Sequence, residues 1–324
     1  MADIIIIGGS IMGSSIAYHL AMTGRAGDVC VIEPDPTYEW AAAPRSSGGV
    51  RLMHGLFENI EMSRYGREVY KNFAQLMDVD GLPGSFDFLE HGYLYLVAGP
   101  DGVAAAEESW KIQTRLGVPN DLLDRDELSA RFPSLYVGDV DAAIHGPQDG
   151  FIDPHAAVTG FRRKATSLGV TYIKDKVVDI QVSGGLAQAV VLESGEIISS
   201  DIVVNVAGAW GPKICAMVGM EIPVQPLSRN TFYFEIQGEV ETLPLTKDPG
   251  GIAFRQEGAG FTVGLTDTDV AFGFNWEVDH DLFESRFWPV LAHRVPAFEA
   301  LQVKRGWAGH YAFNHMDGNT IIGK

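Results

Sequence analysis

The sequence predicts an α/β protein, α+β overall, in which one domain is built on a parallel sheet and a second domain on an antiparallel sheet. Near the N-terminus, two short apolar runs within residues 3–8 and 28–33 flank a segment with apolar positions at helical spacing, residues 11–23. This is the order of a β–α–β unit with parallel strands. Further along, residues 92–97 and 230–235 alternate in the manner of antiparallel strands.

The remaining elements follow from the same patterns. Gly24 is expected to end the first helix as its C-cap, and Asp153 with Pro154 to begin a helix that runs to residue 168. The other helices are expected over residues 58–77, 102–116, 124–131 and 283–294. The other strands are expected over residues 142–145, near residues 170, 177 and 187, and over residues 202–206, 251–255, 261–264, 307–313 and 320–322.

Stretches of parallel and antiparallel character alternate along the chain, so each domain is expected to use more than one stretch. We predict that residues 1–82, 140–224 and 305–324 form the domain with the parallel sheet. Residues 83–139 and 225–304 would form the domain with the antiparallel sheet, which we expect to bind the substrate. A length of 324 residues is comfortable for two domains.

The charge and the apolar runs exclude several classes of partner. The net charge of −18 repels a phosphate backbone, so we expect no nucleic-acid partner. No apolar run approaches the ~18 residues of a membrane span, and the N-terminus lacks the features of a signal peptide or a myristoylation site. We therefore expect a cytoplasmic protein with no membrane span.

Cysteine and histidine usage points to neither a disulfide nor a metal site. Cys30 lies in an apolar strand pattern and Cys215 on a predicted helix, so both are interpreted as buried apolar residues. The nine histidines show no metal-ligand spacing, so we expect no metal.

A glycine-rich turn follows the first predicted strand and opens the first predicted helix. It comprises Gly8, Gly9, Ser10, Ile11, Met12 and Gly13. Gly8 permits a tight turn, Gly13 permits close packing of helix on strand, and the helix N-terminus offers N–H groups to a pyrophosphate. Glu33 ends the second strand about 20 residues on, where a carboxylate accepts hydrogen bonds from ribose hydroxyls. The turn and Glu33 together predict a Rossmann-type dinucleotide-binding domain.

Two further segments of small residues suit a bound cofactor. One is a loop that contains Arg45, Ser46, Ser47, Gly48, Gly49 and Arg51. Its small residues let a flat ring lie against the backbone, and its arginines can neutralise a pyrophosphate or a carboxylate. The other is the turn after residue 206, with Ala207, Gly208 and Trp210. Taken alone, the loop is equally compatible with a solvated surface loop, and the segment that ends in the turn favours an ordinary core strand.

In combination these motifs resemble the D-amino-acid oxidase superfamily of FAD-dependent oxidoreductases. Residues 288–299 and 306–323 resemble a narrower branch of that superfamily. The branch includes sarcosine oxidase beta-like proteins, dimethylglycine dehydrogenase and a mitochondrial FAD oxidoreductase that assists the assembly of respiratory complex I. The resemblance covers essentially the whole chain. It implies a Rossmann-type FAD-binding domain, with the flavin ring between that domain and the antiparallel sheet.

The resemblance also implies how FAD is held. The fingerprint from Ile7 to Gly13, Glu33, the loop and the turn after residue 206 would contact FAD, and the backbone of Val177 would contact the adenine. Covalent attachment in the family uses a Cys close to the C-terminus or a His in the early loop. Neither Cys30 nor Cys215 matches the first position, and residues 41–49 contain no His. We therefore expect non-covalent FAD.

Three residues are candidates for the substrate side of the flavin. Arg51 is the candidate for a charge beside the flavin or the substrate carboxylate, and His310 and Tyr311 are candidates for the substrate face. A core position for Tyr311 and a structural role for either His54 or His310 remain alternatives. Arg229 and Arg255 are weaker candidates for binding a carboxylate.

The activity that the resemblance implies is oxidation of the C–N bond of a secondary amine or amino acid, such as sarcosine, dimethylglycine or glycine. Hydride would pass to the flavin, and water would hydrolyse the resulting imine. Two alternatives remain open: a non-catalytic FAD-binding assembly or scaffold protein, and an FAD-dependent dehydrogenase of a 2-hydroxy acid or of glycerol phosphate. The expected partner is a small-molecule amine or amino acid, with an electron-accepting protein or a second copy of the chain as further options.

The sequence departs from the family pattern at three places. Ser10 replaces a glycine of the fingerprint, and His54 stands where sarcosine oxidases tend to carry a second arginine. Members of the family continue past the motif of residues 321–323 with a strand and a helix that complete the FAD domain, whereas this sequence ends at Lys324. We therefore expect a chain truncated at its C-terminus, with an exposed sheet edge or a partner that covers it.

Overall fold

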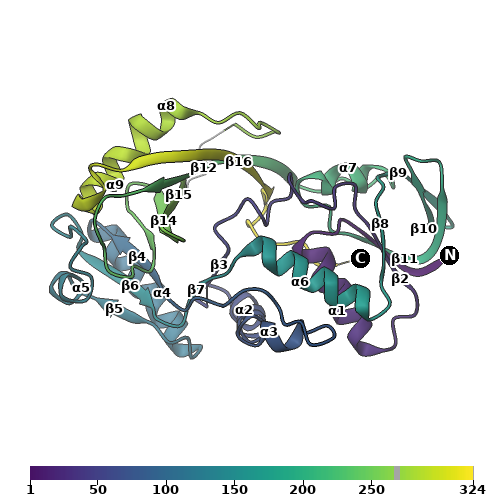
Figure 1. The fold of residues 1–324 in the computed structure, drawn as a ribbon, viewed down its shortest axis with the longest axis horizontal. Helices are drawn as coiled ribbons and strands as arrows, with labels where there is room; N and C mark the ends of the chain where they lie inside the picture. Colours follow the sequence, from purple (N-terminus) through teal and green to yellow (C-terminus); the bar gives the residue numbers. More distant parts are fainter. Residues whose placement is uncertain (266–270, 324) are drawn as a thin grey trace.

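The computed structural model describes residues 1–265 and 271–323. The chain forms two lobes, each organised around one large sheet, as Figure 1 shows. Two long strands, β12 (Val224–Glu235) and β16 (Gln302–Asn314), pair along their whole length and run from one lobe toward the other. The mixed α/β fold with one largely parallel and one largely antiparallel sheet confirms the predicted fold class.

The first sheet has six strands in the order β8-β2-β1-β11-β10-β9. Their bounds are β1 (Ala2–Ile7), β2 (Val29–Ile32), β8 (Thr171–Ile173), β9 (Val177–Ser183), β10 (Leu186–Leu192) and β11 (Ile197–Asn205). The first four in the spatial order are parallel, whereas β9, β10 and β11 form an antiparallel meander. Gly184 and Gly185 both have positive φ between β9 and β10, and so tight a turn can only reverse the chain.

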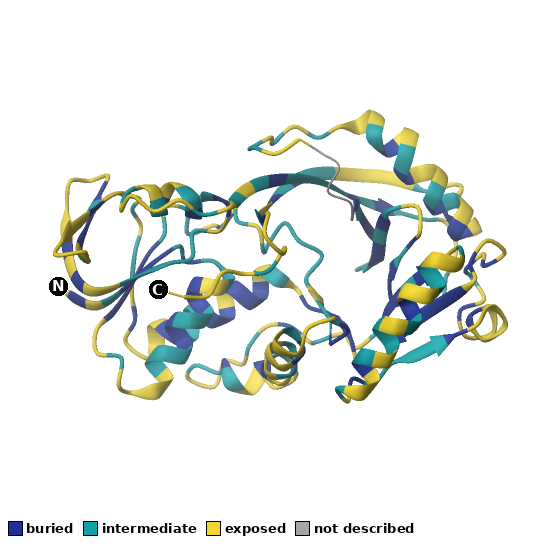
Figure 2. Cartoon of the chain, turned by 180° about the vertical axis from the view of Figure 1, so that it is seen from behind, coloured by how far each residue is buried: buried dark blue, intermediate teal, exposed yellow. Residues whose placement is uncertain are grey.

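Helices α1 (Ile11–Thr23) and α6 (Pro154–Ser167) pack together in the lobe of this sheet. Their buried positions face inward in Figure 2, and Ala17 and Phe161 join Ile6 and Val31 in one apolar cluster. Gly24 ends α1 with φ 63°, and the Asp153 side chain accepts the N–H groups at the start of α6, as expected for both helix ends.

A second apolar cluster contains Ile5, Ile7, Ile32 and Val190. A short helical turn, Gly208–Trp210, and helix α7 (Gly211–Ala216) follow β11, and Ile214 of α7 belongs to this cluster.

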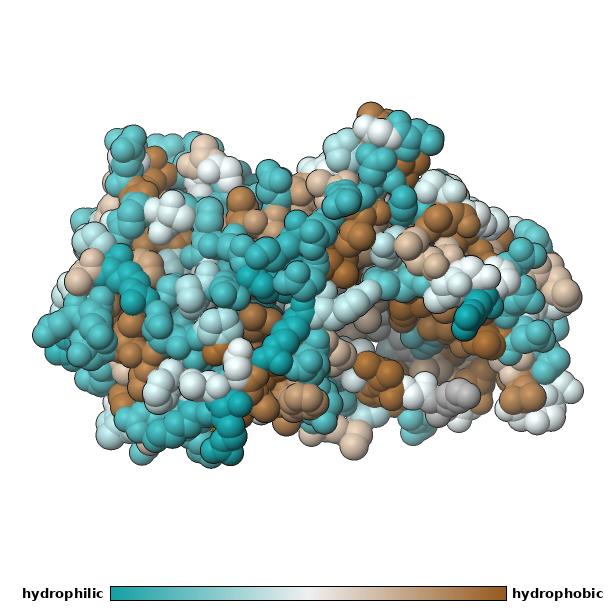
Figure 3. All heavy atoms as spheres, turned by 90° about the horizontal axis from the view of Figure 1, so that it is seen from below, coloured by the Kyte–Doolittle hydropathy of each residue, from teal (hydrophilic) through white to brown (hydrophobic). Residues whose placement is uncertain are grey.

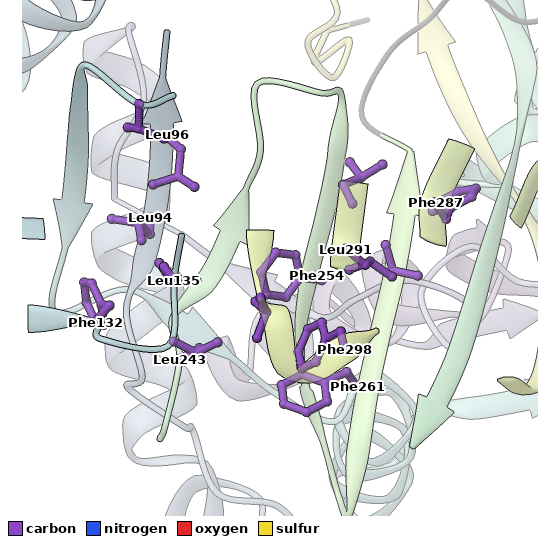
Figure 4. Close-up of a cluster of buried hydrophobic side chains, with 14 of the residues drawn as sticks. Leu94, Leu96, Phe132, Leu135, Leu243, Phe254, Phe261, Phe287, Leu291 and Phe298 are labelled. Carbon is purple, nitrogen blue, oxygen red and sulfur yellow. The ribbon is translucent and has the colours of Figure 1, made fainter. Parts of the chain in front are cut away.

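The second sheet has eight strands in the order β16-β12-β15-β14-β13-β4-β6-β5. Their further bounds are β4 (Tyr93–Val97), β5 (Asp121–Leu123), β6 (Ala142–Gly146), β13 (Leu245–Lys247), β14 (Ile252–Glu257) and β15 (Gly260–Leu265). All of its pairs are antiparallel except β13 with β4. One face carries a large apolar core, drawn in Figure 4, in which Phe254 and Phe261 of the sheet pack around Phe298.

Helices cover that apolar face. They comprise α8 (His280–Leu282), a π-helical turn (Phe283–Phe287), α9 (Trp288–Arg294) and a 3-10 turn (Pro296–Phe298). The other helices are α2 (Phe57–Lys71), α3 (Phe73–Leu76), α4 (Pro100–Arg115) and α5 (Arg125–Arg131). The helix predicted over residues 58–77 is interrupted at Asn72, which lies between α2 and α3 with φ −103° and ψ 14°. Strands β3 (Gly49–Val50) and β7 (Gly150–Phe151) form a small separate sheet.

Two predictions differ from the structure. Strands β6 and β16 belong to the eight-stranded sheet, although the predicted domain boundaries assign residues 140–224 and 305–324 to the other domain. The cause is strand pairing, because β6 pairs with β4 and β16 pairs with β12. Residues 320–323 form no strand, and Ile321 and Ile322 are exposed. The predicted assignment of β6 and β16 is therefore corrected, and the rest of the division into domains stays a prediction.

The surface seen from below is largely hydrophilic, and apolar side chains gather around a hollow on its right-hand half, as Figure 3 shows. Within residues 1–265 and 271–323, no helix combines the length and hydropathy that crossing a bilayer requires. The same residues contain no group of three or more His, Cys, Asp or Glu side chains arranged to hold a metal ion.

Candidate functional site

The glycine-rich turn lies where the carboxyl ends of β1, β2 and β11 meet. The Gly8 N–H donates to Ile32 O (3.0 Å), and the Val206 N–H donates to Ile7 O (3.0 Å). Gly8 has φ +103°, and a Cβ on it would lie 2.7 Å from Val206 O. A Cβ on Gly13 would lie only 1.8 Å from Gly8 O. The two predicted turns therefore pack backbone against backbone, which side chains at these glycines would prevent.

The polar groups of this turn suit a pyrophosphate and a ribose. Ser10 begins α1 without capping it, and within the described chain its buried Oγ has no hydrogen-bond partner. The first N–H groups of a helix are also unpaired, so a hydroxyl and several N–H groups are available to an anion. The Glu33 carboxylate accepts the N–H groups of Gly9 (2.8 Å) and Asp35 (2.9 Å), and burial raises the pKa of Glu33. These residues fit a bound dinucleotide.

Of the other predicted nucleotide contacts, the turn after residue 206 follows β11 at the same edge of the sheet, whereas Val177 begins β9 and pairs with Leu192 of β10. Val177 and Ala207 belong to the apolar cluster that contains Ile7 and Ile32. Gly208 begins a helical turn with φ +55°, and Trp210 ends it, with its ring 4.9 Å from the ring of Phe274. The structure therefore brings the fingerprint and the turn after residue 206 into direct contact, and Val177 belongs to the apolar cluster beside them.

The loop of residues 45–51 runs between the two sheets and is held from both sides. Arg45 donates from Nη1 to Ala308 O (2.7 Å) of β16, and its guanidinium lies over the rings of Trp40 and Trp276. The Ser46 Oγ donates to Ala43 O (2.7 Å) and accepts the N–H of Gly48. These bonds fix the backbone of the loop beside the edge strand β16.

The second half of the loop contacts the eight-stranded sheet and β7. The Arg255 Nε donates to Ser47 O (2.7 Å), and Arg255 also pairs with Glu257. Gly48 has φ +62°, and its carbonyl accepts the N–H of Ile152. Arg255 is thus a buried residue that holds the loop in place, and it is no longer a candidate for binding the substrate carboxylate.

One face of the eight-stranded sheet packs on the large apolar core. The opposite face, called the polar face below, carries aromatic and charged side chains beside a smaller apolar cluster that includes Tyr93, Ile144 and Leu245. Along β4, Leu94 and Leu96 are buried in the core, whereas the rings of Tyr93 and Tyr95 stack 6.2 Å apart on the other face. Successive strand residues point to opposite faces, and paired residues on neighbouring strands point the same way. Lys247 pairs with Tyr95 and therefore shares the polar face.

Arg229 and Tyr311 extend this polar face across β12 and β16. The Arg229 guanidinium carbon lies 4.5 Å from the centre of the Tyr311 ring, and its Nη1 donates to Leu265 O. Tyr311 is 53% exposed, so it is not a core residue.

Arg51 lies beside this polar face. Its Nε donates to Met53 O (3.3 Å), and its charge acts on Tyr93, Tyr95 and Lys247. Burial and the charge of Arg51 together lower the pKa of His54 to about 4, so His54 is neutral at physiological pH. The structure therefore brings Arg51 and Tyr311 near the same ring, since both influence the ionisation of Tyr93.

His310 does not join Arg51 and Tyr311. It is the neighbour of Tyr311 on β16, and adjacent strand residues point to opposite faces. Its Nε2 accepts the N–H of Asn275 (2.9 Å), and its ring lies 4.1 Å from the ring of Trp276. The structure places His310 in an aromatic cluster away from the polar face, and only Tyr311 of the two lies on it.

Asp149 is a further polar residue close to Arg51. It is 1% exposed, and its Oδ1 accepts the N–H of Leu52 (2.7 Å). Within the described chain Oδ2 has no hydrogen-bond partner. Burial raises the pKa of Asp149 to about 7. Asp149 therefore anchors the backbone that follows Arg51.

Sequence reasoning missed four residues of the site: Tyr93, Tyr95, Asp149 and Lys247. The alternation Tyr-Leu-Tyr-Leu over residues 93–96 was a usable signal, because tyrosines on one face and leucines on the other indicate a polar face above a core. No local signal indicates Asp149 or Lys247, because their proximity to Arg51 depends on pairing between distant segments.

A dinucleotide turn on a largely parallel sheet, together with a largely antiparallel sheet that has a cationic and aromatic surface, is typical of a nucleotide-dependent oxidoreductase. Comparison with known proteins supports this class. Residues 3–324 match the family described as DAO, FAD dependent oxidoreductase, and the chain belongs to this family. It is therefore related to FAD-dependent amine and amino-acid oxidoreductases, and its cofactor is FAD.

Three similar proteins illustrate the relationship. The FAD-dependent oxidoreductase domain-containing protein 1 of Xenopus laevis is 34% identical, over 99% of this chain and 72% of that protein. The mitochondrial dimethylglycine dehydrogenase of Homo sapiens is 26% identical, over 93% of this chain and 36% of that protein. The crystal structure of L-proline dehydrogenase from P. horikoshii superimposes with a TM-score of 0.90 and 26% identity, covering 100% of this chain and 84% of that one.

Proposed function

We propose that this protein oxidises a secondary amine or amino acid at the C–N bond, with hydride transfer to FAD. The observation that carries the proposal is the polar face of the eight-stranded sheet, where Arg51 and the Arg229–Tyr311 pair lie with Tyr93 and Tyr95. Guanidinium groups bind a carboxylate, and aromatic faces accommodate N-alkyl groups. Dimethylglycine dehydrogenase and L-proline dehydrogenase, which are similar to this chain, are named for amine substrates, and this supports the proposed oxidation of an amine.

FAD, when bound, supplies the hydride acceptor, and the residues that would hold it are the fingerprint, Glu33 and the loop of residues 45–51. The chain's own side chains then have to orient the substrate. Arg51 would bind its carboxylate, and Tyr93, held against the loop, would fix the distance between the substrate and the loop backbone.

A neutral amine needs no strong base on the protein, because its lone pair assists departure of the hydride from the α-carbon. Loss of the hydride leaves the substrate as an iminium ion, and water hydrolyses this ion to a carbonyl group and an amine with release of a proton. Desolvation of the kind that lowers the pKa of His54 would also favour the neutral form of a bound amine.

The test is an absorption spectrum of the FAD-loaded protein before and after anaerobic addition of N-methyl amino acids, proline and glycine. We expect the flavin absorbance to bleach with at least one of these compounds. As controls, lactate and glycerol phosphate test the hydroxy-acid alternative. A yellow protein that no amine reduces would contradict the proposal and favour a non-catalytic role. A cytoplasmic location and an electron-accepting protein partner stay predictions.

A further inference from the structure

We propose that Lys247 binds a second anionic group of the substrate, so that the preferred substrate class is an N-alkyl amino acid with two carboxylates. This inference rests on the proposed oxidation of an amino acid and adds a specificity determinant to it.

Lys247 lies in the middle of the polar face. Its strand β13 is between β4 and β14, and Lys247 pairs with Tyr95 on one side and Ala253 on the other. The Nζ atom is 5.0 Å from the centre of the Tyr95 ring, and the side chain is half-buried. The ring thus fixes the position of the ammonium group on the sheet face.

The ammonium group of Lys247 has no carboxylate partner in the described part of the chain. The protein carries 42 acidic and 24 basic residues, so carboxylates are plentiful, yet none of the described ones pairs with Lys247. Lys111, Lys176 and Lys304 each pair with a nearby carboxylate. A half-buried cation without a counter-charge loses hydration and gains no ion pair in return. Such a cation favours the binding of an anion from outside.

Arg51 reaches the same part of the face from the loop. The Tyr93 hydroxyl touches Gly49, two residues before Arg51, and the Tyr93 ring stacks on Tyr95 beneath Lys247. Burial lowers the pKa of Lys247 to about 8, and the charges of Arg51 and Arg229 act in the same direction. The Lys247 ammonium is therefore still mostly protonated at pH 7, beside a second cation.

The carboxylate of Asp149 does not neutralise Arg51 or Lys247. Asp149 directs Oδ1 to the N–H of Leu52, and among the described residues no ion pair joins it to Arg51 or Lys247. One substrate carboxylate on Arg51 would leave Lys247 unmatched, whereas a substrate with two carboxylates matches both. The residues next in the row across the sheet are Ala253 and Gly264, so no large side chain of β14 or β15 stands beside Lys247 in this row.

The first experiment measures binding, independently of turnover. Succinate and glutarate are titrated into the FAD-loaded protein by calorimetry, with propionate and butyrate as monocarboxylate counterparts. We expect the dicarboxylates to bind on the order of 10-fold more tightly, as for one added charge-assisted hydrogen bond. Lys247→Met should remove this preference, Lys247→Arg should keep most of it, and Lys176→Met, which removes an exposed paired lysine, should leave it unchanged.

The second experiment measures flavin reduction by N-methylaspartate and N-methylglutamate against N-methylalanine. A preference for the dicarboxylates that Lys247→Met abolishes supports the inference. Equal binding of succinate and propionate, or a preference that survives Lys247→Met, overturns it, even if N-methylalanine reduces the flavin and the proposed function stands. Conversely, a Lys247-dependent preference for succinate without reduction by any amine supports the anion site and contradicts the proposed function.

Discussion

The hydroxyl of Tyr93 occupies the space where a side chain on Gly49 would begin, because a Cβ on Gly49 would lie 1.7 Å from Tyr93 Oη. The loop expected to lie against the flavin and the first strand of the polar face are therefore in direct contact. Gly49→Ala should displace the loop or the ring, weaken FAD binding by about 10-fold or more, and cost about 1–3 kcal/mol of stability.

A double mutant tests the cause of that effect. Tyr93→Phe removes the hydroxyl that the added methyl group would meet, so Gly49→Ala in the Tyr93→Phe background should cost less than in the parent. FAD dissociation constants and urea unfolding of the four proteins give the coupling energy. Equal costs in both backgrounds would show that the contact is unimportant.

Arg51→Ala should slow flavin reduction by substrate on the order of 100-fold or more, because a buried carboxylate loses its partner. The fold should survive, since Arg51 follows β3 in a loop and belongs to neither large sheet. The measurement is the anaerobic reduction rate in a stopped-flow instrument. Arg125→Ala is the matched control, because Arg125 forms an exposed ion pair with Asp141. Reduction of the Arg51 variant at the parent rate would remove Arg51 from the site.

Two glycine-to-alanine changes within helices should act in opposite directions. Gly13 lies in α1, where the added methyl group would be only 1.8 Å from Gly8 O, so Gly13→Ala should abolish FAD binding or folding. Gly66 lies in α2, where an added methyl group would have no neighbouring atom within 4 Å. Gly66→Ala should therefore stabilise the protein by about 0.5–1 kcal/mol. Melting temperatures of the two variants with and without FAD check both predictions. Similar effects of Gly13→Ala and Gly66→Ala would show that the space around each glycine does not decide the outcome.

FAD should be released when the protein is precipitated with acid. Cys30 is buried in β2 and Cys215 lies on α7, so neither has the position that covalent attachment in this family requires. The absorbance of the supernatant after precipitation measures the released flavin. Yellow colour that remains in the pellet would contradict non-covalent binding.

Asp149 should make stability depend on pH. An unfolded aspartate titrates near pH 4, whereas burial raises the pKa of Asp149 in the folded protein to about 7. Between these values the folded state holds a proton that the unfolded state has released, so the free energy of unfolding falls as pH rises. In Asp149→Asn the fall between pH 4 and pH 8 should be smaller, by up to roughly 4 kcal/mol. Urea unfolding across this range measures it, with the exposed Asp87→Asn as control.

Local patterns predicted most individual elements correctly. The bounds of α1 coincide with the prediction, since a glycine-rich turn precedes the helix and Gly24 follows it. The cap of α6 by Asp153 is equally local. The predicted strand over residues 320–322 is absent, because a short apolar run forms a strand only where a neighbouring strand offers hydrogen bonds.

The candidate site was predicted in part. Arg51 and Tyr311 lie on one surface, as expected for the substrate side. His310 lies on the opposite face of the same strand, and the sequence offered no means to choose between two neighbours without knowing which face of β16 was buried.

The sequence by itself determined the dinucleotide turn, the helix ends and, through them, the family, because these features depend on residues close together in the chain. Only the tertiary structure decided that Tyr93, Lys247 and Tyr311 share one face with Arg51 beside them. These residues come from strands distant in sequence, and their neighbours depend on the order and register of eight paired strands. Strand order and register are set by burial of the whole apolar face of the sheet. No single segment of the sequence specifies that face.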